Sequence, residues 1–393
     1  MKKNLNKLAT LALTGAMVAG MSFGAMAATN VAYNGGVMTK AVMTDGKTYA
    51  PNTTFSFTVS EVKSVDGIST EKMVVTKGKT VADYLKPTTG NQAKGVHVGD
   101  ITFSGADKNL GAVLDNGTNG FKGTSAITVD AGTFTEPGIY VFSVKENEGN
   151  YEGISYSKAE YYLLVVVQNA ETGDDLVVSQ VSMSRKSDGT KLTTFYNNYG
   201  CENVPENPDP ENPDKPEYPS DDKVWDLKIS KEITGLGANK SGEFHFTVSV
   251  VAADGSTDTD YRIYTVDGDA ETFKQDASSD AALTVTNGTT YHIYGLTEGD
   301  TVTLKETEAG QNGYTATYTM DGVEQETTNG TLDATNGVAI NAKKNNATAK
   351  VTNEKTQIAI TGVAMNIAPY AAMVLGAGAF AGIFLGMKKK DEE

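Results

Sequence analysis

The chain has 393 residues, ten prolines, one cysteine and a formal charge of −16. A single cysteine cannot form a disulfide within the chain, and so few prolines exclude a collagen-like protein. The 49 acidic residues outnumber the 33 Lys and Arg. This excess argues against a nucleic-acid partner, because neutralising phosphates needs a basic surface. The length is sufficient for two domains.

The first 27 residues have the layout of a signal peptide. Three lysines precede an apolar run, and the small residues Ala25 and Ala27 occupy the positions before the cleavage site that a signal peptidase recognises. We therefore predict that residues 1–27 are removed and that the exported protein starts at Ala28.

A proline-rich segment divides the exported chain. Six of the ten prolines fall between Pro205 and Pro219, among acidic and amide side chains. This composition predicts that residues 200–223 form an extended, semi-rigid, self-repelling linker. The segments on either side, residues 28–199 and 224–355, each have the size of an independently folding domain.

Both predicted domains have the pattern of β-structure, with short alternating runs rich in Thr, Val, Tyr and Phe between Gly-rich turns. Residues 55–60 and 244–250 are near copies, so the two domains look like divergent repeats. Residues 161–167 are apolar on both faces, which predicts a central strand. The expected architecture is a sandwich of two sheets.

Each domain also has three polar residues in step with the apolar face of a strand. Residues two apart in a strand share a face, so these side chains are predicted to point into the core. In chain order they are a Lys, a Glu and an Asn in both domains, namely Lys40, Glu146 and Asn197, then Lys231, Glu306 and Asn353.

A buried lysine tends to lose its proton, and a buried carboxyl group tends to gain one. A neutral amine is a nucleophile, and a protonated Glu can polarise the Asn carbonyl. The amine could then attack the side-chain carbon and expel ammonia, which would leave a Lys–Asn isopeptide bond. The alternative is a buried Lys–Glu salt bridge beside an incidental Asn. The duplicated arrangement favours the bond.

Residues 356–393 have the layout of an anchoring tail. The run from Val363 to Met387 is almost wholly apolar and is followed by three lysines. This predicts a membrane-spanning segment with its basic end in the cytoplasm.

Several of these stretches together resemble the streptococcal-type major pilins of Gram-positive, sortase-assembled pili. They are Lys40 followed by Pro51-Asn52-Thr53, Pro137-Gly138-Ile139-Tyr140 leading to Glu146, the closing Phe195-Tyr196-Asn197, and the tail from Thr361 to Tyr370. The resemblance implies an all-β fold of two tandem immunoglobulin-like β-sandwich domains. It also implies one self-formed Lys–Asn bond in each domain, promoted by Glu146 in the first and by Glu306 in the second.

The resemblance further implies that a sortase transpeptidase cleaves between Thr361 and Gly362. The Thr carbonyl would pass to a lysine of the next copy or to cell-wall peptidoglycan. Ile358 and Ala359 replace the Leu and Pro of the common sorting motif, which favours a dedicated sortase. The acceptor suggested by the resemblance is Lys191. Other lysines also remain candidates, namely Lys186, Lys215 and Lys223.

We interpret the chain as the shaft subunit of a sortase-polymerised, cell-surface pilus that supports adhesion or colonisation. The expected partners are the sortase, other copies of the chain, peptidoglycan, the membrane transiently through the tail, and a host surface ligand. No cofactor, metal or enzymatic activity beyond self-crosslinking is expected. The alternative functions are a wall-anchored adhesin that does not polymerise and a secreted hydrolase. The hydrolase is disfavoured because no catalytic cluster stands out and the three histidines are isolated in sequence. Cys201 is expected to have no specific role in the function of the protein.

Overall fold

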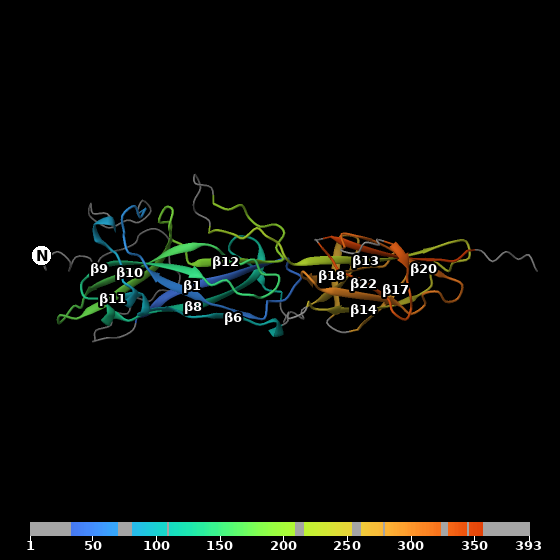
Figure 1. The fold of residues 1–393 in the computed structure, drawn as a ribbon, viewed down its shortest axis with the longest axis horizontal. Helices are drawn as coiled ribbons and strands as arrows, with labels where there is room; N and C mark the ends of the chain where they lie inside the picture. Colours follow the sequence, from blue (N-terminus) through green and yellow to red (C-terminus); the bar gives the residue numbers. More distant parts are fainter. Residues whose placement is uncertain are drawn as a thin grey trace, which may run out of the picture.

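The computed structural model describes residues 33–69, 81–107, 110–208, 216–253, 261–277, 280–323, 329–343 and 346–356. Its strands form two groups that lie end to end along the longest axis of the molecule (Figure 1). We call the part with strands β1 to β12 the N-terminal unit and the part with β13 to β23 the C-terminal unit. The prediction of a mainly β protein is confirmed.

The two ends of the sequence lie outside the described residues. The predicted signal peptide, the Thr361–Gly362 cleavage site and the apolar run to Met387 all fall there. Within the part of the chain that the structure describes, no helix is both long and apolar enough to cross a membrane.

One sheet of the N-terminal unit brings the first and last strands of that unit together. Its order is β12-β1-β8-β5, with β7 added beside β8. The strands are β1 (Tyr33–Thr44), β5 (Val96–Val98), β7 (Ala112–Val113), β8 (Asn119–Val129) and β12 (Thr194–Tyr199). β1 and β12 are parallel neighbours, with Val42 opposite Asn197.

The second sheet of this unit has the order β11-β10-β9-β3, with β4 beside β9. Its strands are β3 (Phe57–Glu61), β4 (Leu85–Lys86), β9 (Gly138–Glu146), β10 (Glu160–Asn169) and β11 (Leu176–Arg185). β10 is flanked on both sides, and its alternate residues enter two different apolar clusters, with Leu163 in one and Leu164 in the other. The prediction of a central strand is confirmed.

Smaller elements complete the N-terminal unit. A two-stranded sheet pairs β2 (Thr53–Phe55) with β6 (Ile101–Phe103). The single α-helix among the described residues, α1 (Gly90–Lys94), begins at Thr89, which forms a capping box with Gln92. Three short 3₁₀ turns are η2 (Val81–Tyr84), η3 (Gly105–Asp107) and η4 (Ala131–Thr133).

The C-terminal unit repeats the parallel pairing of first and last strands. Its larger sheet has the order β16-β15-β18-β13-β23-β20-β21 and its smaller sheet the order β17-β14-β19-β22. β13 and β23 are parallel, with Ile233 opposite Asn353. The strands are β13 (Trp225–Thr234), β14 (Phe244–Val251), β15 (Arg262–Asp267), β16 (Ala270–Asp276), β17 (Ala281–Val285), β18 (Thr290–Leu296), β19 (Thr301–Glu306), β20 (Thr315–Asp321), β21 (Asn329–Thr331), β22 (Val338–Ile340) and β23 (Ala347–Glu354).

The described part of the linker does not form the extended spacer that its composition predicts. Cys201 and Tyr218 are both buried, in a small apolar cluster on the N-terminal unit. The Tyr218 ring lies edge-on to Tyr196 with centroids 4.9 Å apart. The Asn198 amide donates to the Cys201 carbonyl at 3.0 Å and to the Pro219 carbonyl at 3.4 Å. Burying an aromatic ring outweighs the tendency of the proline-rich, acidic chain to stay in water.

Candidate functional site

The Lys and the Asn of each predicted triad lie on the parallel pair of first and last strands. Lys40 is opposite Phe195, two residues before Asn197. In the C-terminal unit Lys231 is opposite Val351, again two residues before the Asn of its triad. Because residues two apart share a face, the Lys and the Asn of each triad point the same way. The register offset is therefore identical in the two units.

The Glu of each triad comes from the other sheet of its unit. Glu146 is the last residue of β9 and lies opposite Phe57 of β3. Glu306 is the last residue of β19 and lies opposite Phe246 of β14. These two phenylalanines occupy matching places in the near-copy strand pattern of the sequence. Each triad thus joins two sheets across a core.

The first triad is fully enclosed. Lys40 and Asn197 have no exposed surface. The Lys40 Nζ lies 3.2 Å from Oε2 of Glu146, and Asn197 donates through Nδ2 to Oε1 of the same carboxyl at 2.7 Å. The backbone N–H of Ser157 donates to the Asn197 carbonyl at 2.7 Å. Glu146 therefore meets the amide nitrogen, whereas the mechanism drawn from the sequence expected it to meet the carbonyl.

Burial changes the proton affinities of the first triad. It lowers the pKa of Lys40 from 10.5 to about 8, against the opposing effect of the nearby Glu146 carboxylate. It also raises the pKa of Glu146, although Lys40 and Asn197 act in the opposite direction. The Phe55 ring lies 4.9 Å from Nζ. Both shifts favour transfer of a proton from the amine to the carboxyl group.

The second triad has the same neighbours around its carboxyl group, although its lysine makes a hydrogen bond there, whereas Lys40 donates to the backbone carbonyls of Ala41 and Phe195. Lys231 donates to Oε2 of Glu306 at 2.9 Å, and the Asn353 amide nitrogen hydrogen-bonds to Oε1. The Nζ of Lys231 is 4.5 Å from the centre of the Phe244 ring. Burial lowers the pKa of Lys231, against the effect of Glu306. The Asn353 carbonyl oxygen, in contrast, has no hydrogen-bond partner within the described residues.

The candidate acceptor lysines lie away from both triads. Lys191 is half-buried in the hairpin between β11 and β12, opposite Ser184, and burial lowers its pKa. Lys186 is paired with Glu160 at 3.1 Å, and Lys223 is exposed. Lys215 lies outside the described residues, as do Thr361 and Gly362.

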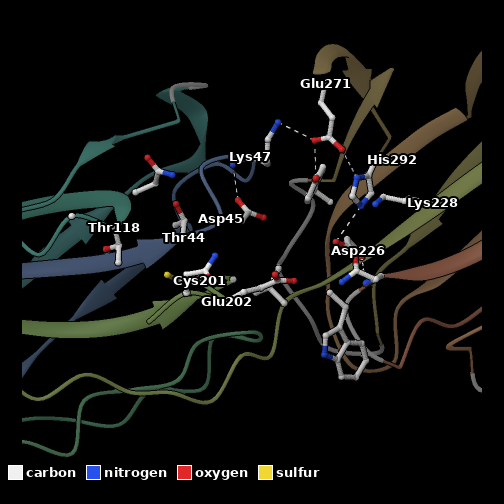
Figure 2. Close-up of a pocket in the computed structure, with 18 residues that line it drawn as sticks. Thr44, Asp45, Lys47, Thr118, Cys201, Glu202, Asp226, Lys228, Glu271 and His292 are labelled. Carbon is white, nitrogen blue, oxygen red and sulfur yellow. Dashed lines mark hydrogen bonds and ion pairs between the residues drawn. The ribbon is translucent and has the colours of Figure 1, made fainter. Parts of the chain in front are cut away.

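A partly buried network at the junction of the two units escaped the sequence analysis. Lys47 of the N-terminal unit pairs with Glu271 at 2.9 Å, and Glu271 contacts Nδ1 of His292 at 2.6 Å (Figure 2). The Nε2 of His292 lies 3.1 Å from Asp226. Arg262 also donates to the Lys47 carbonyl at 2.8 Å. His292 is isolated in the sequence because its partners come from distant segments that only the folded chain brings together.

The sequence of each unit matches a known family. Residues 28–200 match the family described as Spy0128-like isopeptide containing domain, and residues 225–355 match a family described as a domain of unknown function. Over 320 residues the chain is 25% identical to a curated protein of Streptococcus pyogenes serotype M1 named Pilin. That alignment covers 77% of this chain and 81% of the relative.

Solved structures share the fold. The crystal structure of the major pilin from Streptococcus pyogenes matches with a TM-score of 0.53 at 18% identity, covering 84% of this chain and all of that one. Another major pilin from the same organism matches with a TM-score of 0.50 at 17% identity, covering 83% and 98% of the two chains. With the sequence matches, these similarities confirm the resemblance to the streptococcal-type major pilins.

Proposed function

We propose that this chain, a relative of the streptococcal-type major pilins, is the repeating shaft subunit of a pilus and cross-links itself once in each unit. The observation that carries the proposal is the repeated triad. Two units of different sequence hold a Lys, a Glu and an Asn in the same strands and with the same register offset. A merely structural salt bridge would not need an Asn at the same offset in both.

The contacts support a route in which the Glu carries the proton. Nζ of the lysine passes a proton to the carboxylate, and the neutral amine attacks the side-chain carbon of the Asn. The Glu then donates a proton to the departing amide nitrogen, which it already contacts in both triads. One C–N bond forms, one C–N bond breaks and ammonia leaves. The attacking nitrogen also gives up a second proton, which leaves with the ammonia as ammonium, so the Glu ends as the carboxylate with which it began.

The position of the bonds fits a part that carries tension. Within each unit the Lys is on the first strand and the Asn on the last, so a bond between them joins the points where the chain enters and leaves. Tension would pass through the covalent link and bypass the hydrogen bonds of the sheets. The link would also close a long loop and reduce the entropy of the unfolded chain, as a disulfide does.

Assembly and anchoring complete the proposal. The chain would be exported through its signal peptide, fold as two immunoglobulin-like domains and be held in the membrane by its tail until a sortase cleaves between Thr361 and Gly362. The Thr carbonyl would pass to Lys191 of another copy or to peptidoglycan, which places the protein at the cell surface. Self-crosslinking would be its only chemistry, and a host ligand would account for adhesion.

Intact mass tests the cross-links. Residues 28–356 contain every described strand, so this fragment is suitable. The expected mass is short by two ammonias. Glu146→Ala and Glu306→Ala should each restore one, whereas Glu160→Ala, which removes a carboxylate from the outside of the N-terminal unit, should restore none. The full unmodified mass in folded protein would refute the cross-links.

Polymerisation has its own test. A ladder of detergent-resistant, high-mass species in wall extracts is expected from a shaft subunit. A single wall-linked species would instead indicate an adhesin that does not polymerise.

A further inference from the structure

A cavity of about 640 Å³ lies where the linker folds against the N-terminal unit. One wall comes from the segment between β9 and β10 and includes Ser155 and Tyr156. Arg185, at the end of β11, forms part of another wall, and the linker residue Tyr218 forms a third. The cavity is separate from the junction network of His292, and one of its lining residues, Ser157, also donates its backbone N–H to the Asn197 carbonyl of the first triad.

Arg185 lacks the partners that a buried guanidinium needs. The residue is only 5% exposed, yet its Nε and Nη2 have no hydrogen-bond partner among the residues that the structure describes. Ser155, also on the cavity wall and 5% exposed, has a hydroxyl group that is likewise unpaired within the described part of the chain. Arginine stays charged at any physiological pH, and a buried charge without a counter-charge is strongly destabilising. The arrangement therefore calls for a ligand that brings negative charge and accepts hydrogen bonds.

The other charges of the cavity do not supply that partner. Asp188 accepts hydrogen bonds from the backbone N–H of Thr190 at 3.0 Å and from its hydroxyl group at 2.5 Å. The remaining charged side chains on the cavity wall are exposed, three acidic and two basic, namely Glu148, Glu217, Asp221, Lys158 and Lys223. Exposed charges are screened by water and salt, whereas a buried guanidinium is screened much less. Arg185 thus dominates the inner wall.

The lining also indicates the class of the ligand. No Leu, Ile, Val, Met or Phe is found among the described lining residues, so an apolar peptide such as residues 358–361 would find no aliphatic side chain of these types to pack against. The wall instead offers the rings of Tyr156 and Tyr218 and several serine hydroxyl groups. Aromatic rings pack against the C–H faces of sugars, and hydroxyl groups pair with hydroxyl groups. The volume is within the usual range of small-molecule sites.

We propose that this cavity binds a carboxylate-bearing sugar, with the carboxylate on Arg185 and the sugar ring against the partly exposed ring of Tyr156. A guanidinium and a carboxylate match as a pair of parallel hydrogen bonds. The proposal goes beyond the shaft function, because it makes the shaft itself a surface for acidic glycans. Many copies along one fibre would turn a weak site into strong attachment through multivalency.

The test measures binding of two acidic sugars, N-acetylneuraminic acid and D-glucuronic acid, to residues 28–356 by calorimetry and ligand-observed NMR. At least one acid should bind with saturation, and its methyl ester should bind more weakly by roughly ten- to a hundredfold. Arg185→Gln should cause a similar loss for the acid and none for the ester. Arg185→Lys should retain part of the affinity. Lys86→Gln, which removes an exposed charge paired with Glu136, is the matched control and should change nothing.

Several outcomes would overturn the proposal. They are saturable binding of neither acid, equal binding of acid and ester, an unchanged affinity in a folded Arg185→Gln variant, or equal affinity for acetate. If a peptide with the sequence of residues 354–361 binds more strongly than either acid, the occupant of the cavity is a second copy of the chain and not a sugar. Folding of each variant is checked by intact mass and thermal melting. The Arg185 variants leave Ser157 and Lys223 of the cavity wall unchanged, and the mass loss and the polymer ladder are measured without any sugar, so a failure here leaves the shaft proposal standing.

Discussion

The two triads have the same three residue types and the same register, but they differ at the Asn carbonyl. In the N-terminal unit this oxygen accepts a hydrogen bond from the backbone of Ser157. In the C-terminal unit the corresponding oxygen of Asn353 has no partner among the described residues. The donor in the first unit comes from the segment between β9 and β10, outside the strands that hold the triad.

This difference separates two requirements of the proposed reaction. The strands bring the amine, the carboxyl group and the amide together in both units, with the amine 3.2 Å from the carboxyl oxygen in the first triad and 2.9 Å in the second. Stabilising the negative charge that develops on the Asn oxygen during attack requires a further donor. Only the first triad has that donor in place, so the two bonds are expected to form at different rates.

The largest expected effect comes from removing one bond at a time. Asn197→Ala and Asn353→Ala each prevent one cross-link that closes a loop of more than a hundred residues. Each change should lower the free energy of unfolding of its own unit by roughly 5 kcal/mol, because the unfolded chain regains the entropy of the open loop. Differential scanning calorimetry would measure the loss. Asn52→Ala on the surface is the control, and an equal melting temperature in all variants would contradict the prediction.

The next largest effect tests the hydrogen bond from the backbone N–H of Ser157 to the Asn197 carbonyl. Ser157→Pro removes the backbone N–H and should slow bond formation in the N-terminal unit by roughly 10²- to 10³-fold, without changing the C-terminal unit. Ser157→Ala keeps the N–H and serves as the matched control. The rates would be followed by mass spectrometry of proteolytic fragments during refolding. Equal rates for the two variants would show that this hydrogen bond does not assist the reaction.

A pH effect distinguishes the free lysine from the linked one. In Asn197→Ala, Lys40 remains an amine whose pKa falls from 10.5 in the unfolded chain to about 8 in the folded one. The unfolded chain therefore binds more protons between these values, so the stability of this unit should rise with pH over that interval, by up to roughly 3 kcal/mol.

The cross-linked protein provides the comparison for this pH effect. Its Lys40 is an amide and no longer titrates, so the difference in melting temperature between wild type and Asn197→Ala should shrink as the pH rises from about 8 to about 10. A difference that stays constant over this range would mean that Lys40 keeps its proton when buried.

The smallest expected effect concerns the junction of the two units. Burial alone would raise the pKa of Glu271, but hydrogen bonds from His292, Lys47 and Tyr294 lower it to about 2. Its contribution to stability is therefore present above the unfolded value and is lost as the pH falls toward 2. A double-mutant cycle of Lys47→Met and Glu271→Gln should give a coupling of about 1 kcal/mol at neutral pH.

The coupling free energy between Lys47 and Glu271 should decrease at acidic pH. An exposed ion pair serves as the reference for this measurement. Lys86 and Glu136 form an exposed ion pair on the N-terminal unit, and the same cycle there should give a smaller value. Equal couplings for the two pairs, or a junction coupling that persists at about pH 2, would show that the Lys47–Glu271 contact contributes nothing specific.

Strand periodicity predicted much of the site. The alternation around Lys40 and Lys231 placed their side chains inside, and both are buried. The apolar run through Leu164 predicted a central strand, and β10 is one. These inferences succeed because the side-chain direction in a strand depends only on position along the chain.

Other features depended on contacts between segments far apart in sequence. The composition of the linker predicted an extended chain, but the ring of Tyr218 found an apolar site on the folded N-terminal unit. His292 stands on the outer face of its strand by alternation, yet it is 3% exposed at the junction, between two carboxylates. Nothing in the residues beside either side chain indicates these partners.

For this protein, the sequence by itself determined the β-strands, the two sets of inward-facing Lys, Glu and Asn, and the resemblance to major pilins. Only the tertiary structure decided which atom of each Asn meets its Glu, that Ser157 donates to the Asn of the first triad, and that two guanidinium nitrogens of buried Arg185 have no partner among the described residues. The physical reason is that periodicity determines the face on which a side chain lies. Distances and partners across a core are determined by how the sheets, loops and linker pack together.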